Sequence, residues 1–198
     1  MKSLFIFIVV LSILSLSSSQ SATPVRDTDR NILRSGTNYY ILPVNRGSGG
    51  GITLAPGRDE PCPFDVAQEN NELNNGSPWH FEPANPNKEN TIYESTDLNV
   101  RFSRPGQCLP NPVWRFEYYE EGRIVSSHGM VGSPGKETIR NWFKIQKYED
   151  DYKFVYCPSV CQDCRPYCAD IGSTIAKNGR RVLALNNKPL KVKFKKAI

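Results

Sequence analysis

Several short stretches of the chain alternate large apolar side chains with charged ones. The pattern is clearest in residues 114–118 (WRFEY) and 191–195 (KVKFK), and residues 152–156 (YKFVY) form a third stretch that is rich in aromatic side chains. A period of two places successive side chains on opposite faces of an extended chain, so each stretch predicts a β-strand with one buried face. No window of ten or more residues combines a helical period with capping residues. The sequence therefore predicts an all-β protein.

Turn signals separate the predicted strands. Glycine, proline and asparagine cluster at these points because they adopt the backbone angles that tight turns require. Strand starts near Tyr40, Val100 and Phe154 lie 60 and 54 residues apart. This spacing fits three repeats of four strands each, which would close a threefold barrel. The turn segments are residues 47–51, 74–76, 133–135 and 178–179.

The N-terminus has the features of a secretory signal peptide. Lys2 precedes an apolar stretch of 13 residues, 4–16, and small polar residues follow it. Such a stretch would form a helix of about 20 Å, which is too short to span a hydrocarbon core of about 30 Å. We therefore expect a signal peptide over residues 1–20, with a boundary as late as residue 22, and a single domain over residues 21–198. The expected location is extracellular (the apoplast) or the vacuole.

The composition excludes several classes of protein. Of the 198 residues, 38 % are hydrophobic and 23 % are charged, which fits neither a disordered chain nor a polytopic membrane protein. The net charge of +5 is small and mixed along the chain, so we expect neither a nucleic-acid partner nor a membrane partner. The two histidines, His80 and His128, have no recognisable nucleophile or metal-ligand spacing. We therefore expect no enzyme, no metal site and no cofactor.

Six cysteines suit an oxidising compartment, where an even number predicts disulfides. The last four form the cluster C-x3-C-x2-C-x3-C. Four thiolates at this spacing could also bind zinc, and the central C-x2-C resembles a redox motif, but export favours disulfides over both. Counting alone leaves fifteen pairings open. The six residues are Cys62, Cys108, Cys157, Cys161, Cys164 and Cys168.

The N-terminal segment 24–43 (PVRDTDRNILRSGTNYYILP) closely resembles the opening signature of the plant Kunitz (soybean trypsin inhibitor) family. Further matches follow in order over the rest of the chain, and the cysteine cluster from residue 157 to 164 is similar to the miraculin-like branch. These matches are residues 49–52, 62–63, 95–100, 113–115, 132–135, 142–145, 152–158, 170–172, 180–185 and 193–196.

The resemblance implies a disulfide-stapled β-trefoil of twelve strands with threefold pseudo-symmetry. It implies the nested bridges Cys157–Cys168 and Cys161–Cys164, together with Cys62–Cys108. It also implies a secreted, non-catalytic inhibitor of endopeptidases with a role in plant defence. The miraculin-like branch includes a dimer linked through an extra cysteine, but this chain has Tyr148, Glu149 and Asp150 in that neighbourhood, so we expect a monomer.

Family inhibitors of serine proteases present one exposed loop that binds the protease as a substrate does. The matching segment here is residues 82–95, in which Pro83 and Pro86 favour an exposed, extended loop. Counting back from the strand that ends at Phe102 places the primary specificity residue on Lys88, whereas counting forward from Gly76 places it near Pro86. The resemblance also places Ser35 where a family asparagine supports the loop. The expected binding residues are Pro86, Asn87, Lys88, Glu89 and Asn90.

The expected partners are secreted or digestive endopeptidases, trypsin-like enzymes first and papain-like enzymes second. Lys88 suits a trypsin-like pocket with an acidic floor, while Glu89 after it is less favourable. Two alternatives stay open. One is an inhibitor of papain-like cysteine proteases that acts through another loop, and the other is a non-inhibitory trefoil with a binding, storage or signalling role. Asn75, in the sequon Asn-Gly-Ser, is a candidate glycosylation site.

Overall fold

The computed structural model describes residues 22–56, 62, 64–104, 110–119 and 122–197. The expected signal peptide and Cys108 lie outside these residues. The described part of the chain forms twelve β-strands, no α-helix and one short 3-10 helix, η1 (Ile139–Asn141). The prediction of an all-β protein is confirmed. The strands are β1 (Tyr39–Pro43), β2 (Ile52–Ala55), β3 (Asp65–Gln68), β4 (Pro78–Pro83), β5 (Leu98–Phe102), β6 (Val113–Tyr119), β7 (Gly122–Gly129), β8 (Lys144–Tyr148), β9 (Asp151–Tyr156), β10 (Ala169–Ile175), β11 (Arg181–Asn186) and β12 (Val192–Lys196).

Six of the strands form a closed ring. Strand β1 pairs with β12 and β4, β4 pairs with β5, and β9 pairs with β8 and β12, all antiparallel. The ring closes through Leu98 at the start of β5 and Phe143 just before β8, whose backbone N–H and C=O groups exchange hydrogen bonds of 2.8 and 2.9 Å. A closed ring leaves no free strand edge, so the ring strands are protected from edge-to-edge association.

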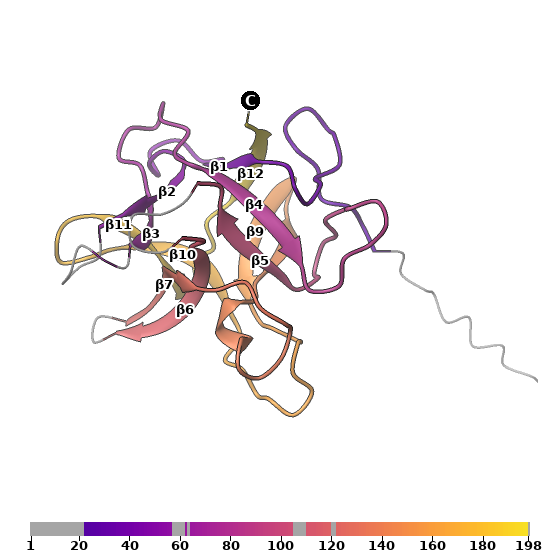
Figure 1. The fold of residues 1–198 in the computed structure, drawn as a ribbon. Coiled ribbons are helices and arrows are strands. Elements are labelled where there is room, and N and C mark those ends of the chain that lie inside the picture. The colour runs from indigo at the N-terminus through magenta and orange to yellow at the C-terminus, as the bar shows by residue number, and fades with distance from the viewer. Residues whose placement is uncertain (1–21, 57–61, 63, 105–109, 120–121, 198) are drawn as a thin grey trace, which may run out of the picture.

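The other six strands form three hairpins, β2–β3, β6–β7 and β10–β11. One strand of each hairpin pairs with one strand of each of the others, because β3 contacts β7 and β11, and β7 contacts β11. Figure 1 shows these hairpin strands gathered on the left, beside the ring strands β1, β4, β5, β9 and β12. The ring and the hairpin cluster together position the loops that connect them.

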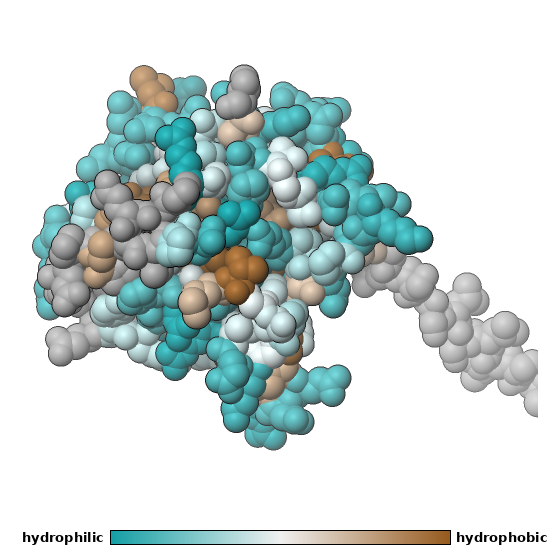
Figure 2. All heavy atoms as spheres, viewed as in Figure 1, coloured by the Kyte–Doolittle hydropathy of each residue, from teal (hydrophilic) through white to brown (hydrophobic). Residues whose placement is uncertain are grey.

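Large aromatic side chains fill the space inside the ring. Trp114 lies at their centre, with ring centroids 5.6 Å from Trp79, 5.7 Å from Phe143 and 4.9 Å from Phe154. Each buried side chain of this size contributes about 1.5–3 kcal/mol relative to exposure to water. The surface in Figure 2 is mainly polar, with small hydrophobic patches. Among the described residues, no helix has the length and apolar character needed to cross a membrane.

Candidate functional site

The connection between β4 and β5, residues 84–97, contains every residue expected to bind a protease. We call it the β4–β5 loop. It projects to the right in Figure 1, beside the N-terminal segment of the described chain. Its base is closed by a hydrogen bond of 2.8 Å from the Ala84 N–H to the carbonyl oxygen of Asp97. The side chains of Pro86, Lys88, Glu89 and Asn90 are exposed, and that of Asn87 is half-buried.

Lys88 and Glu89 occupy the tip of a tight turn. The Asn90 N–H donates a hydrogen bond of 3.0 Å to the carbonyl oxygen of Asn87, and Asn90 has a left-handed backbone with φ of 55°. The expectation of an extended backbone is therefore wrong at Lys88 and Glu89. The reason is local, because asparagine tolerates the left-handed conformation that lets the chain reverse here. The Lys88 side chain is nevertheless exposed.

The expectation that Pro83 belongs to an unpaired loop is also wrong. Pro83 is the last residue of β4 and lies opposite Leu98 of β5. Proline lacks an N–H group, so a strand accepts it most readily at an end or an edge. The N–H of the next residue, Ala84, supplies the hydrogen bond that closes the ladder at Asp97.

The Asn87 side chain braces the turn from within. Its Nδ2 donates a hydrogen bond of 2.7 Å to the carbonyl oxygen of Thr91, and its Oδ1 accepts one of 2.9 Å from the Thr91 N–H. Thr91 is buried, with 4 % of its surface exposed. The turn is thereby tied to a fixed point of the fold. Sequence reasoning named Asn87 only as a contact residue, and its spacing of four from Thr91 is a weak signal for this role.

A second support comes from the N-terminal segment. Arg34 donates hydrogen bonds through a guanidinium nitrogen to the carbonyl oxygen of Glu89 and, over 2.7 Å, to the hydroxyl oxygen of Thr91. The Ser35 N–H donates a hydrogen bond of 2.8 Å to the carbonyl oxygen of Asn90. Ser35 thus contacts the loop through its main chain, and within the described residues its hydroxyl makes no hydrogen bond. Sequence reasoning missed Arg34.

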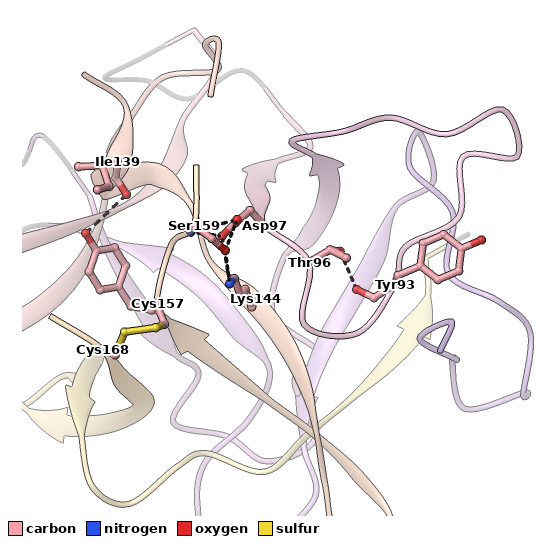
Figure 3. Close-up of polar contacts among 9 residues, drawn as sticks. Tyr93, Thr96, Asp97, Ile139, Lys144, Cys157, Ser159 and Cys168 are labelled. Atoms are coloured by element: carbon pink, nitrogen blue, oxygen red, sulfur yellow. Dashed lines mark hydrogen bonds and ion pairs between the residues drawn. A yellow bond between two sulfur atoms is a disulfide. The ribbon is translucent and has the colours of Figure 1, made fainter. Parts of the chain in front are cut away.

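The C-terminal end of the loop is anchored to the cysteine cluster. Figure 3 shows that Asp97 faces Ser159 and Lys144. Ser159 lies two residues after Cys157, which belongs to the cysteine cluster. The Asp97 carboxylate accepts hydrogen bonds of 3.1 Å from the Ser159 N–H and 2.9 Å from its hydroxyl. Lys144 Nζ lies 3.8 Å from the same carboxylate and donates to the Ser159 hydroxyl over 2.6 Å.

The cysteine cluster forms two nested disulfides. Cys157 is bonded to Cys168 and Cys161 to Cys164, the same pairs that the family resemblance implies. Cys62 is also disulfide-bonded, while its expected partner Cys108 lies outside the described residues. The described residues contain no free cysteine and no group of three or more His, Cys, Asp or Glu side chains placed to bind a metal ion.

Other predicted positions lie away from the loop tip. Asn75 is exposed in the connection between β3 and β4. His80 lies on β4 and His128 on β7, where His128 Nδ1 is 3.2 Å from Glu117. At the loop itself, burial raises the pKa of the Glu94 carboxyl, and the positive charge of Lys147 opposes that rise.

Several proteins are similar to this chain over most of its length. It is 40 % identical over 200 residues to Kunitz trypsin inhibitor 5 of Arabidopsis thaliana, covering 98 % of this chain and 97 % of that one. It is 43 % identical over 194 residues to miraculin of Synsepalum dulcificum, covering 92 % and 88 %. A solved structure of a Kunitz-type cysteine protease inhibitor from potato superposes with a TM-score of 0.79 at 34 % identity, covering 90 % of this chain and 99 % of that one.

The profile of one family, described as trypsin and protease inhibitors, matches residues 25–196. The match extends over the ring, the hairpins and the β4–β5 loop. This family consists of inhibitors and not of enzymes, in agreement with the expectation from the residue chemistry. The chain belongs to the Kunitz family of trypsin and protease inhibitors.

Proposed function

We propose that this protein is a secreted inhibitor of serine endopeptidases that occupies the protease active site with the tip of the β4–β5 loop. The observation that carries the proposal is that the tip of the loop is exposed while hydrogen bonds hold the backbone next to it. Lys88 and Glu89 are exposed, while Asn87 and Arg34 tie the residues beside them to the buried Thr91. A role in plant defence follows from the family.

Bracing favours inhibition over cleavage for a physical reason. A flexible peptide loses conformational freedom when a protease binds it, and this loss weakens binding. In the β4–β5 loop the ordering has already occurred during folding. After a cut at the tip, the hydrogen bonds of Asn87 and Arg34 would hold the two new ends in place, which favours resealing of the bond over release.

Lys88 is the primary specificity residue in this proposal. Its ammonium group on a flexible stem suits a deep pocket with an acidic floor. To lie extended in a protease cleft, the backbone at Lys88 must open the hydrogen bond from Asn90 to Asn87. Opening one such bond costs about 0.5–1.5 kcal/mol. We therefore expect inhibition of trypsin-like enzymes that is measurable but weaker than the tightest family members achieve.

Two observations favour a second candidate function, inhibition of papain-like cysteine proteases through another loop. The turn at Lys88 departs from the extended backbone that serine proteases bind, and one of the similar solved structures is a cysteine protease inhibitor from potato. In that case Lys88 would not contribute to inhibition.

We also propose that the fold is a β-trefoil. The closed ring of six strands and the three mutually paired hairpins support this assignment, since each of the three successive runs of four strands supplies two ring strands and one hairpin. Secretion is proposed from the N-terminal sequence pattern and from the disulfides of the cysteine cluster. The protein is proposed to act as a monomer.

The deciding experiment is a titration of the purified mature protein against trypsin, chymotrypsin, subtilisin and papain. The Lys88→Ala variant should lose the inhibition of trypsin, because alanine cannot reach the acidic floor of the pocket. Lys188→Ala, which removes an exposed lysine outside the loop, is the matched control and should inhibit as the original chain does. Inhibition of papain that survives Lys88→Ala would establish the second candidate. Absence of inhibition of all four enzymes at micromolar protein would refute both.

A further inference from the structure

A second exposed segment lies beside the β4–β5 loop. Residues 130–138 connect β7 to η1, and we call them the β7–η1 loop. The two loops flank a hollow of about 420 Å³. Pro83, Ala84 and Pro86 line it on one side, and Val131, Gly132 and Pro134 line it on the other. The hollow is therefore continuous with the proposed protease-binding surface.

The β7–η1 loop exposes apolar side chains that the core does not use. Met130 is 71 % exposed and Val131 is 52 % exposed. A second hollow of about 440 Å³ is lined by Met130 and Val131 together with Glu82, Arg101 and Pro110. Val131 lines both hollows and Met130 lines the second. We call these two exposed side chains the Met130–Val131 ridge.

Side chains in and beside η1 hold the backbone of the β7–η1 loop in place. Asn141, with 3 % of its surface exposed, donates a hydrogen bond of 3.0 Å from Nδ2 to the carbonyl oxygen of Met130. Thr138 Oγ1 donates to the carbonyl oxygen of Ser133 over 2.7 Å, and Trp142 Nε1 donates to Thr138 Oγ1 over 3.0 Å. The β7–η1 loop is therefore braced from beneath, as the β4–β5 loop is. Two neighbouring loops with fixed backbones form one preorganised surface.

The size of a protease interface requires surface beyond the loop tip. A standard interface covers about 800 Å² and 20–30 residues on each partner. At the tip of the β4–β5 loop, only residues 85, 86 and 88–90 are exposed. A protease seated on the tip must cover neighbouring surface as well. Val131 of the ridge shares a hollow with Pro86 at that tip, so the ridge belongs to the surface next to the tip.

We propose that the Met130–Val131 ridge is a second contact for the endopeptidase that the β4–β5 loop binds, and that the hollow between Pro86 and Val131 receives a bulky apolar side chain from the rim of the protease cleft. This inference rests on the proposed function. Prolines, Val131 and Trp142 supply apolar walls to this hollow, which Ser35, Glu82 and Asn99 also line. Glu82 lines the second hollow as well, and its charge is neutralised by Arg101, whose Nε lies 2.6 Å away. The flexible thioether of Met130 can adapt to rims of different shape.

The test compares inhibition constants of the original chain, the double variant Met130→Gln with Val131→Thr, and the control Leu73→Gln. The double variant replaces two apolar side chains with polar ones of similar size and adds no charge. Leu73 is 90 % exposed in the connection between β3 and β4, so the control removes an equally exposed apolar side chain elsewhere. Thermal unfolding of all three proteins checks that each is folded.

The ridge contact predicts that the double variant inhibits the target protease at least tenfold more weakly, with an unchanged melting temperature, and that Leu73→Gln inhibits as the original chain does. Equal inhibition by all three proteins would overturn the ridge contact and leave the proposed function standing. An original chain that inhibits no protease in the panel would overturn the proposed function, and the ridge contact with it. The two failures are therefore distinguishable.

Discussion

At the scale of single residues, Asn87 braces the turn that exposes Lys88. Its side chain makes two hydrogen bonds to the backbone of Thr91, four residues along, and its carbonyl oxygen accepts the hydrogen bond that closes the turn. Lys88 has the chemistry for a protease pocket, but its position depends on this neighbour. In the proposed function, Lys88 would enter the protease pocket and Asn87 would hold the backbone that presents it.

Replacing Asn87 with alanine should loosen the turn without unfolding the protein. Two hydrogen bonds to Thr91 are lost, each worth about 0.5–1.5 kcal/mol. We expect faster hydrogen exchange at the Thr91 N–H, inhibition weakened about tenfold and faster cleavage of the chain after Lys88. Exchange is measured by nuclear magnetic resonance, and cleavage by mass spectrometry during incubation with the protease.

Asn85→Ala is the matched control for exchange at Thr91. Asn85 is exposed in the same loop, and within the described residues its side chain makes no hydrogen bond to Thr91. Thr91 should exchange at the original rate in this control. If Asn87→Ala also left the exchange rate unchanged, the brace would have no energetic role.

At the scale of elements, the β4–β5 loop is held at its C-terminal end by a chain segment distant in sequence. Asp97 binds Ser159, which follows β9 by three residues and lies beside the Cys157–Cys168 disulfide. The Asp97 side chain is 11 % exposed and that of its ion-pair partner Lys144 is 14 % exposed. Partial burial of this kind makes charge-assisted hydrogen bonds stronger than those at an open surface.

Asp97→Asn should lower the stability of the protein by about 1–2 kcal/mol, since the amide keeps one acceptor but loses the charge and the second acceptor. A loss of this size lowers the melting temperature by a few degrees in a protein of this length. Thermal unfolding followed by circular dichroism measures it. Asp163→Asn changes an exposed aspartate in the cysteine cluster and should leave the melting temperature unchanged. Equal melting temperatures for the two variants would contradict the anchoring role of Asp97.

The elements themselves were largely predictable from sequence. The alternating stretches at residues 114–118, 152–156 and 191–195 became β6, β9 and β12 with bounds within one residue. Their period of two is a local property, so it is visible without the fold. The sequence placed Pro83 in the loop, whereas it is the last residue of β4. Proline indicates that a strand ends nearby, but not whether it ends before or after the proline.

At the scale of the whole molecule, folding lowers the pKa of one histidine. His80 lies on β4, and its Nδ1 is buried with no hydrogen-bond partner. Burial lowers the pKa of His80 from its ordinary value of 6.5, the positive charge of Arg101 lowers it further, and Glu82 opposes both effects. As the pH falls through 6.5, His80 therefore binds a proton more readily in the unfolded chain than in the folded chain.

The free energy of unfolding should fall as the pH falls through 6.5, because stability decreases with decreasing pH wherever the unfolded state binds more protons. His80→Gln removes this titration, so the dependence should weaken in that variant. The chain contains one other histidine, and His128→Gln is the control that should retain the dependence. Urea unfolding at a series of pH values between about 5 and 7, where histidine titrates, measures it. An identical pH dependence in the original chain and His80→Gln would refute the assignment.

The candidate site was predictable only in part. The sequence order placed Lys88 and its neighbours in one loop, because a loop is continuous in sequence. It did not reveal that Arg34 reaches Glu89 and Thr91 across 55 and 57 positions, or that Ser159 reaches Asp97 across 62. Such contacts depend on how the strands pair, and residue type carries no signal for them.

The sequence by itself therefore determined the all-β class, the strand and turn positions, and the cysteine cluster, since each follows from residues that are neighbours along the chain. Only the tertiary structure decided how the loop is held. Closing the ring through Leu98 and Phe143 accompanies two further contacts of the β4–β5 loop. The N-terminal segment lies against residues 89–93, and the cysteine cluster lies against Asp97 at the C-terminal end. It also places Val131 beside Pro86. Long-range hydrogen bonds and packing fix these positions, and they exist only once the ring has closed.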